Sequence, residues 1–207
     1  PNALWIETPG GQKWTYTDVD IMSARYAGAL RSLDVTQGDR VLVQVDKSPY
    51  ALLLYLATLR IGAIFVPLNT AYTPTEVAYF LGDAQPRLFV ARPKTEDDLV
   101  DIARNTGAAL LTFDTDGAGS LADAMANAEA VEEIASTDAN DIASIIYTSG
   151  TTGRSKGAML SHDNLASNAL TLIDLWDFVK LMYCYTRCRS TTFTDYSSPF
   201  IARCCVA

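Results

Sequence analysis

The chain has 207 residues, of which 49% are apolar and 19% are charged, and it carries a formal net charge of −8 with a pI near 4.6. This length and apolar content allow one or two globular domains with a buried core. The acidic balance excludes the broad basic surface that nucleic acids and anionic membranes require. We therefore expect small-molecule partners, no nucleic-acid or membrane partner, and at most a local phosphate site; the composition leaves the oligomeric state open.

Predicted strands and helices alternate along most of the chain. A hairpin is predicted over residues 4–16, followed by a helix whose apolar residues recur every three or four positions and whose N-cap is assigned to Thr17. Later helices are predicted to begin at capping residues, namely Ser48, Thr73 and Ser120, and one further helix covers residues 96–105. The predicted strands cover residues 41–45, 64–66, 88–90, 110–113 and 142–146.

These strands are nearly continuous in apolar residues, which is typical of strands buried on both faces. The alternation of strands and helices predicts an α/β fold, a parallel sheet flanked by helices, with ligands held in loops at strand ends. The apolar stretch at residues 50–68 is interrupted by Arg60, Gly62 and Pro67, so we interpret it as a helix followed by a buried strand and not as a membrane span. No signal-peptide pattern is visible before Trp14, and a cytoplasmic location is expected.

Residues 147–157 have a composition that a folding core does not require. They follow the apolar run at 142–146 and contain hydroxyl side chains, glycines and two cations. Glycines let several backbone N–H groups converge on one anion, hydroxyls add donors, and Lys156 adds a compact positive charge. The stretch therefore predicts a phosphate-binding loop, although most glycine- and serine-rich segments are ordinary surface turns.

The loop does not fit a P-loop NTPase. That motif places Gly-Lys-Ser/Thr at the start of a helix, whereas Lys156 lies between Ser155 and Gly157 and is followed by a short apolar strand at residues 158–160. The loop is therefore predicted to join two strands.

The string from Tyr147 to Gly157, with residues 158–165 after it, resembles the signature loop of the adenylate-forming superfamily, which contains acyl-CoA synthetases, peptide-synthetase adenylation domains and luciferases. Residues 38–41, 56–58 and 66–73 support the resemblance. Within the superfamily the sequence is most similar to malonyl-CoA synthetases, and the likeness extends to about Phe178. The resemblance implies that residues 1–180 are part of an N-terminal AMP-binding domain with the fold of these enzymes.

The resemblance also implies a reaction. An acid–CoA ligase of this kind uses Mg²⁺ and ATP to convert a small carboxylic acid, here malonate, into an acyl adenylate, and then transfers the acyl group to CoA. By the same likeness, the phosphates of ATP would be held by Thr148, Ser149, Gly150, Thr151, Thr152, Gly153, Arg154, Ser155 and Lys156.

Other parts of the family's machinery have no counterpart in this sequence. These parts are the motif that contacts nucleotide and Mg²⁺, the acid-binding arginine and the C-terminal domain with its lysine. No residue is identified as certainly catalytic or as a metal ligand, and the single histidine, His162, has no neighbouring ligand residue. We expect this chain by itself to be inactive, and the alternatives are a nucleotide-binding module without chemistry or a truncated, non-catalytic fragment.

Residues 181–207 form a tail that does not match the family. All four cysteines lie in it. It contains three arginines and one aspartate, so its net charge is +2, whereas residues 1–180 carry −10. A zinc site or a disulfide pair would explain the cysteines, but their spacing is not that of Cys-x-x-Cys, and an otherwise cysteine-free acidic chain is typical of a reducing compartment. A third hypothesis is that the tail is a frameshifted reading of the gene.

Reading the tail's codons one nucleotide earlier permits a string that begins Asp-Val-Leu-Leu-His-Ala-Leu-Pro-Ile-Tyr-His. Malonyl-CoA synthetases continue past this helix with a very similar segment. Met182-Tyr183 requires a valine in the shifted frame, whereas most other positions are only permitted by codon degeneracy.

Sequencing the encoding DNA through the codons for residues 178–207 tests the frameshift. We expect codons that yield this string in the shifted frame, followed by an open frame for the rest of a ligase. Codons that cannot encode the string would exclude the hypothesis.

Overall fold

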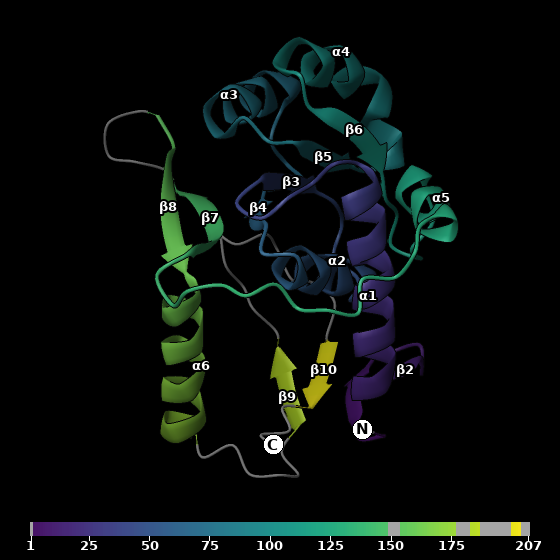
Figure 1. The fold of residues 1–207 in the computed structure, drawn as a ribbon, viewed down its shortest axis with the longest axis vertical. Helices are drawn as coiled ribbons and strands as arrows, with labels where there is room; N and C mark the ends of the chain where they lie inside the picture. Colours follow the sequence, from purple (N-terminus) through teal and green to yellow (C-terminus); the bar gives the residue numbers. More distant parts are fainter. Residues whose placement is uncertain (1, 149–153, 177–182, 187–199, 204–207) are drawn as a thin grey trace. The chain divides into compact units, whose positions relative to one another are not determined.

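The computed structural model describes residues 2–148, 154–176, 183–186 and 200–203 (Figure 1). The chain divides into two compact units, one containing Ser23–His162 and the other the described residues up to Met22 and from Asp163 onward. Each unit has its own sheet.

The larger unit contains a six-stranded sheet in the order β6-β5-β3-β4-β7-β8. Every neighbouring pair is parallel except β7 and β8, which are antiparallel. This confirms the predicted α/β class with a mainly parallel sheet. The strands are β3 (Arg40–Gln44), β4 (Ile64–Pro67), β5 (Leu88–Ala91), β6 (Ala109–Thr112), β7 (Ile142–Thr148) and β8 (Lys156–Ser161).

Helices cover both faces of this sheet, with α3 and α4 on one side and α2 on the other (Figure 1). The apolar stretch at residues 50–68 forms α2 and β4, as predicted from its interruptions. A short 3₁₀ helix, Pro93–Thr95, precedes α4. The helices are α1 (Tyr16–Ser32), α2 (Pro49–Arg60), α3 (Pro74–Ala84), α4 (Glu96–Thr106) and α5 (Ser120–Asn127).

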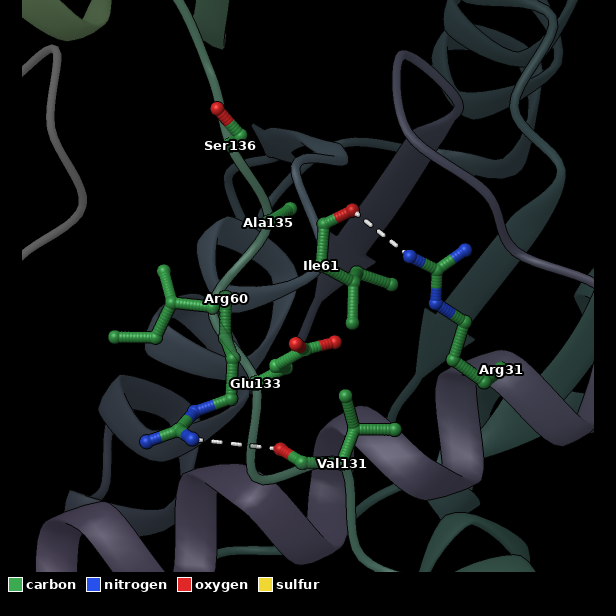
Figure 2. Close-up of a pocket in the computed structure, with 8 residues that line it drawn as sticks. Arg31, Arg60, Ile61, Val131, Glu133, Ala135 and Ser136 are labelled. Carbon is green, nitrogen blue, oxygen red and sulfur yellow. Dashed lines mark hydrogen bonds between the residues drawn. The ribbon is translucent and has the colours of Figure 1, made fainter.

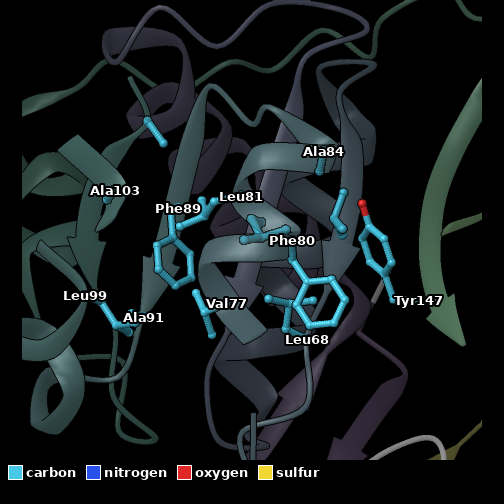
Figure 3. Packing of buried hydrophobic residues seen from close by; sticks show 13 residues of the cluster. Leu68, Val77, Phe80, Leu81, Ala84, Phe89, Ala91, Leu99, Ala103 and Tyr147 are labelled. Carbon is cyan, nitrogen blue, oxygen red and sulfur yellow. The ribbon is translucent and has the colours of Figure 1, made fainter. Parts of the chain in front are cut away.

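The core explains why the strands are apolar without alternation. On one face, Phe80 from α3 and Leu99 from α4 pack in a buried cluster with Leu42 and Phe89 from the strands (Figure 3). On the other face, the ring of Phe65 in β4 lies 5.1 Å from that of Tyr55 in α2. Successive strand residues point to opposite faces, so a sheet covered on both sides needs apolar residues at nearly every strand position.

Two of the predicted helix caps are confirmed. The Ser48 hydroxyl accepts a hydrogen bond from the Ala51 N–H at 3.1 Å, and Pro49 occupies the first turn of α2. Thr73 and Glu76 form the predicted capping box of α3, and the backbone and side-chain hydrogen bonds from Thr73 hold the pKa of Glu76 below its usual value. These reciprocal bonds satisfy backbone groups that the first helical turn would otherwise leave unpaired.

Two other caps are placed differently from the prediction. Thr15, not Thr17, lies at the start of α1, where its backbone N–H and hydroxyl each donate to Asp18 at 2.7 Å. Ser120 is the first residue of α5 and makes no cap; its hydroxyl accepts a hydrogen bond from the Thr112 N–H at 2.8 Å. Ser120 is chemically suited to capping, but its contact with Thr112 in β6 decided its partner. Thr15 makes a local cap two residues earlier than predicted, because its hydroxyl accepts a hydrogen bond from the Asp18 N–H at 3.2 Å.

The smaller unit contains an antiparallel sheet in the order β2-β1-β10-β9 and the helix α6 (His162–Trp176). β1 (Leu4–Glu7) and β2 (Lys13–Thr15) form the predicted hairpin. β9 (Tyr183–Thr186) and β10 (Phe200–Arg203) fall in the tail, where no strand was predicted, and β10 pairs with β1 so that Ala202 lies opposite Ile6. Within the described ranges, no helix is both long enough and apolar enough to cross a membrane.

A close backbone approach in the larger unit explains one glycine inside a helix. The segment after α5 crosses α1, and the Val131 N–H donates to the Ala24 carbonyl at 2.9 Å. A Cβ at Gly28 would lie 2.0 Å from the Glu129 carbonyl oxygen, whereas a Cβ at Gly82, in the last turn of α3, would meet nothing within 4 Å.

Alanine at these two glycines should therefore have opposite effects on stability. Gly82→Ala should raise the free energy of unfolding by up to about 1 kcal/mol, because alanine is the better helix former. Gly28→Ala should lower it by about 1–3 kcal/mol, because the added methyl group displaces the crossing segment. Urea denaturation of both variants measures the difference, and an equal gain at both positions would contradict the close approach.

Candidate functional site

The predicted phosphate loop lies between β7 and β8. Thr148 and Lys156 face each other as the last described pair of the antiparallel ladder, next to the pair Tyr147 and Gly157. The prediction that the loop joins two strands is therefore confirmed. Five of the predicted phosphate-binding residues lie outside the described part of the chain, and their roles stay predictions: Ser149, Gly150, Thr151, Thr152 and Gly153.

The loop leaves the sheet at its carboxyl edge. β7 is parallel to β4, and Thr148 is the last residue of β7, so the loop begins where the parallel strands end. Open α/β sheets bind their ligands outside the carboxyl ends of their strands. The position of the loop thus agrees with that rule.

Three of the four described residues of the predicted site are exposed: Thr148, Arg154 and Lys156. Lys156 forms no ion pair with any residue that the structure describes, and so its ammonium group is available to an anion. The guanidinium carbon of Arg154 lies 6.0 Å from the centroid of the Tyr79 ring, at the outer limit of a cation–π contact. Positive charge is therefore concentrated beside the loop of a strongly acidic chain.

Side chains of α3 contact both strands next to the loop. The Tyr147 hydroxyl donates a hydrogen bond to Asp83 Oδ2 at 2.6 Å, and the Tyr79 hydroxyl donates to the Ser155 carbonyl at 2.8 Å. Burial, followed by the bond to Asp83, raises the pKa of Tyr147 well above its usual value, so this phenol stays protonated and remains a donor. Tyr79 and Asp83 were not predicted as site residues. Their spacing of four residues on a helix can be seen in the sequence, but their partners on β7 and at the start of β8 cannot.

A second polar cluster lies at the carboxyl edge, between the ends of β3 and β5. Arg92 donates to the Thr70 carbonyl at 2.8 Å, and its Nη1 lies 3.5 Å from Asp46 Oδ1, while Lys94 Nζ lies 3.5 Å from Asp46 Oδ2. The cluster links the chain segments that follow β3, β4 and β5. Sequence reasoning missed it because its members come from three separate loops.

A pocket of about 300 Å³ lies elsewhere in the larger unit, between α1, the end of α2 and residues 131–136 (Figure 2). Two arginines line it, but both point toward main-chain carbonyls. Arg31 Nη2 donates to Ile61 at 3.5 Å, and Arg60 Nη1 donates to Glu132 at 2.7 Å and to Val131 at 3.3 Å. Both guanidinium groups therefore hydrogen-bond to main-chain carbonyls at the end of α2 or after α5. None of the predicted phosphate-binding residues lines this pocket.

Comparison with known proteins assigns the chain to a family. The family model described as AMP-binding enzyme matches residues 2–190. The 4-coumarate–CoA ligase 5 of Oryza sativa subsp. japonica is 33% identical over 178 residues, which cover 83% of this chain and 32% of that protein. A long-chain-fatty-acid–CoA ligase of Mycobacterium tuberculosis is 28% identical over 165 residues, covering 80% of this chain and 33% of that protein.

A solved structure gives a higher identity. The crystal structure of ATP-bound MatB from Rhodopseudomonas palustris is 49% identical to this chain, with a TM-score of 0.83, and the match covers 87% of this chain and 36% of that one. The chain thus spans about a third of the length of the relatives that it matches. Because the family model matches nearly the whole sequence and the MatB structure shares 49% identity with it, the chain belongs to the AMP-binding, adenylate-forming enzyme family.

Proposed function

We propose that this chain is part of an acid–CoA ligase that activates its substrate as an acyl adenylate. In the first half-reaction a carboxylate oxygen attacks the α-phosphorus of ATP, and pyrophosphate leaves. In the second half-reaction the CoA thiol attacks the acyl carbon, loses its proton and displaces AMP. The observation that carries this proposal is the cation-bearing loop at the carboxyl end of β7, in a chain that belongs to the adenylate-forming family.

The chain's own residues would act mainly on the leaving group. Pyrophosphate departs with growing negative charge, and fixed donors beside it lower the barrier more than water does, because they need no reorganisation. Lys156 supplies a free ammonium and Thr148 an exposed hydroxyl. Arg154, which is also exposed and lies two residues before Lys156 in the sequence, would add a second positive charge. The backbone amides of residues 150–153 are proposed, by likeness to the family, to complete the cradle.

Malonate is the proposed acid. The relatives differ in what their names say they use, since one is a 4-coumarate–CoA ligase and another a long-chain-fatty-acid–CoA ligase. The higher identity is to MatB, at 49% against 33% and 28%, and the sequence itself resembles malonyl-CoA synthetases. We give the higher identity more weight, because identity near 30% is shared by relatives with different substrates.

Mg²⁺, CoA and cellular location complete the proposal. The described residues include no group of three or more carboxylate, histidine or cysteine side chains able to hold a metal ion, so no Mg²⁺ ligand is assigned and Mg²⁺ is proposed to enter bound to ATP. CoA is the proposed acyl acceptor. We propose the cytoplasm as the location, where both ATP and CoA are supplied.

Removing the loop's donors should slow adenylation in the complete protein. Lys156→Ala should reduce malonate-dependent exchange between ATP and pyrophosphate about 100-fold, as loss of one preorganised charge-stabilising group typically does. Thr152→Ala should reduce it about tenfold through loss of a hydrogen bond to a charged group. Lys94→Ala is the matched control, because Lys94 is also a cation at the carboxyl edge but is paired with Asp46; equal activity of all three variants would contradict the proposed role of the loop.

The choice of acid is tested separately. With hydroxylamine as the acyl acceptor, the complete protein should form a hydroxamate from malonate in the presence of ATP at a rate at least tenfold above that with 4-coumarate or a long-chain fatty acid. A preference for either of those acids would keep the ligase and reject malonate. If ATP binds and protects the loop but no hydroxamate forms, a nucleotide-binding module would be favoured instead. If neither protection nor hydroxamate is observed, a non-catalytic fragment would be favoured.

A further inference from the structure

One face of α3 lies against the two strands that carry the phosphate loop. Tyr79, Phe80 and Asp83 lie within five positions of the helix, and each contacts β7 or the segment that enters β8. Residues four apart on a helix lie on the same side, so Tyr79 and Asp83 reach the two strands from one rigid element. α3 therefore supports the strand on each side of the predicted phosphate loop, and what this support contributes to adenylation rests on the proposed function.

The first contact is made with β7. Tyr147 is only 7% exposed, its ring lies 4.6 Å from that of Phe80, and its hydroxyl donates to Asp83 at 2.6 Å. A bond of this length to a carboxylate is a strong, charge-assisted one. It fixes the backbone of β7 one residue before Thr148.

The second contact is made at the start of β8. The Tyr79 hydroxyl donates to the carbonyl of Ser155 at 2.8 Å, directly before Lys156, and the ring of Tyr79 lies beneath the guanidinium group of Arg154. Among the residues that the structure describes, β8 is the last strand in the order of its sheet and pairs with β7 alone. A strand held on one side alone is less constrained at its end, so the contact from α3 gives β8 a second support.

α3 is a rigid support for β7 and β8. Its N-terminus has a complete capping box, its C-terminus ends at Gln85 in the left-handed conformation, and Val77, Phe80 and Leu81 are buried in the core (Figure 3). A helix with capped ends and a buried face moves little. Groups that bind a ligand are effective only when residues behind them hold them to within about 0.5 Å.

We propose that Tyr79 and Asp83 are positioning residues for adenylation, which hold the two ends of the phosphate loop so that Thr148 and Lys156 are in place before ATP binds. Neither residue needs to touch a substrate. The free energy for positioning Thr148 and Lys156 is then supplied during folding and not at the expense of ATP binding.

The two half-reactions separate this role from a general role in stability. Pyrophosphate leaves in the first half-reaction only, so a displaced loop slows ATP–pyrophosphate exchange and leaves thioester formation from added malonyl-adenylate and CoA unchanged. A variant that merely lowers the folded fraction lowers both rates by the same factor. The ratio of the two rates is therefore the measurement.

The variants for the complete protein are Tyr79→Phe, Tyr147→Phe, Asp83→Ala and Asp83→Asn. The phenylalanine variants keep the ring packing and remove one hydroxyl each, and we expect each to reduce kcat/KM for ATP in the exchange reaction about 5- to 30-fold. Asp83→Ala should do the same, and Asp83→Asn should restore most of the rate because its amide oxygen can accept the bond from Tyr147. Thioester formation should stay within about twofold of the unmodified protein in every variant.

Tyr55→Phe is the matched control, because Tyr55 packs on Phe65 on the opposite face of the sheet and should leave both half-reactions unchanged. If Tyr147→Phe does not fold, Tyr79→Phe alone decides, since its partner is a main-chain carbonyl near the exposed start of β8. Unchanged exchange in the positioning variants, with exchange reduced by Lys156→Ala, would overturn this inference and leave the proposed function standing. An equal fall in the rates of both half-reactions in the positioning variants would also overturn it. An unchanged exchange rate in Lys156→Ala would overturn the proposed function together with the inference.

Discussion

The packing of Phe80 against the sheet is the interaction on which the larger unit depends. Its ring contacts those of Tyr72, at 4.8 Å, and Tyr147, at 4.6 Å, and so connects α3 with β7 and with the segment after β4. Aromatic side chains bury a large area and pack in preferred tilted or edge-on arrangements, and such contacts orient the helix as well as hold it. The same contact sets which face of α3 lies toward β7.

The sheet and the loop place opposite demands on the sequence. The strands β3, β4 and β5 need apolar residues on both faces because helices cover both, whereas the phosphate-binding role proposed for the loop requires polar groups that remain free for an anion. The chain separates these demands along β7. Ala143 and Tyr147 are buried, while Thr148 is exposed, so one strand leads from the core to the ligand-binding edge.

The cations of the chain also divide into those that hold the structure together and those that are exposed near the predicted loop. The chain is acidic as a whole, and several of its cations are engaged in holding structure: Arg92 joins the ends of three strands through Thr70 and Asp46, and Arg60 caps the segment after α5. Lys156 forms no ion pair with any of the described residues. An exposed cation without a protein partner keeps its charge for a bound anion, which is the role proposed for Lys156.

The sequence alone determined the α/β class, the strands of the larger unit and their apolar character, the capping box at Thr73 and Glu76, and a glycine- and hydroxyl-rich segment that joins two strands, because these depend on local spacing and residue type. The tertiary structure decided the strand order, the partner of Ser120, and the pairing of Tyr147 with Asp83 and of Tyr79 with Ser155. Those contacts join residues 64 and 76 positions apart. No local pattern specifies which of many tyrosines meets which acceptor, since that choice follows from how helices and strands pack once the core has formed.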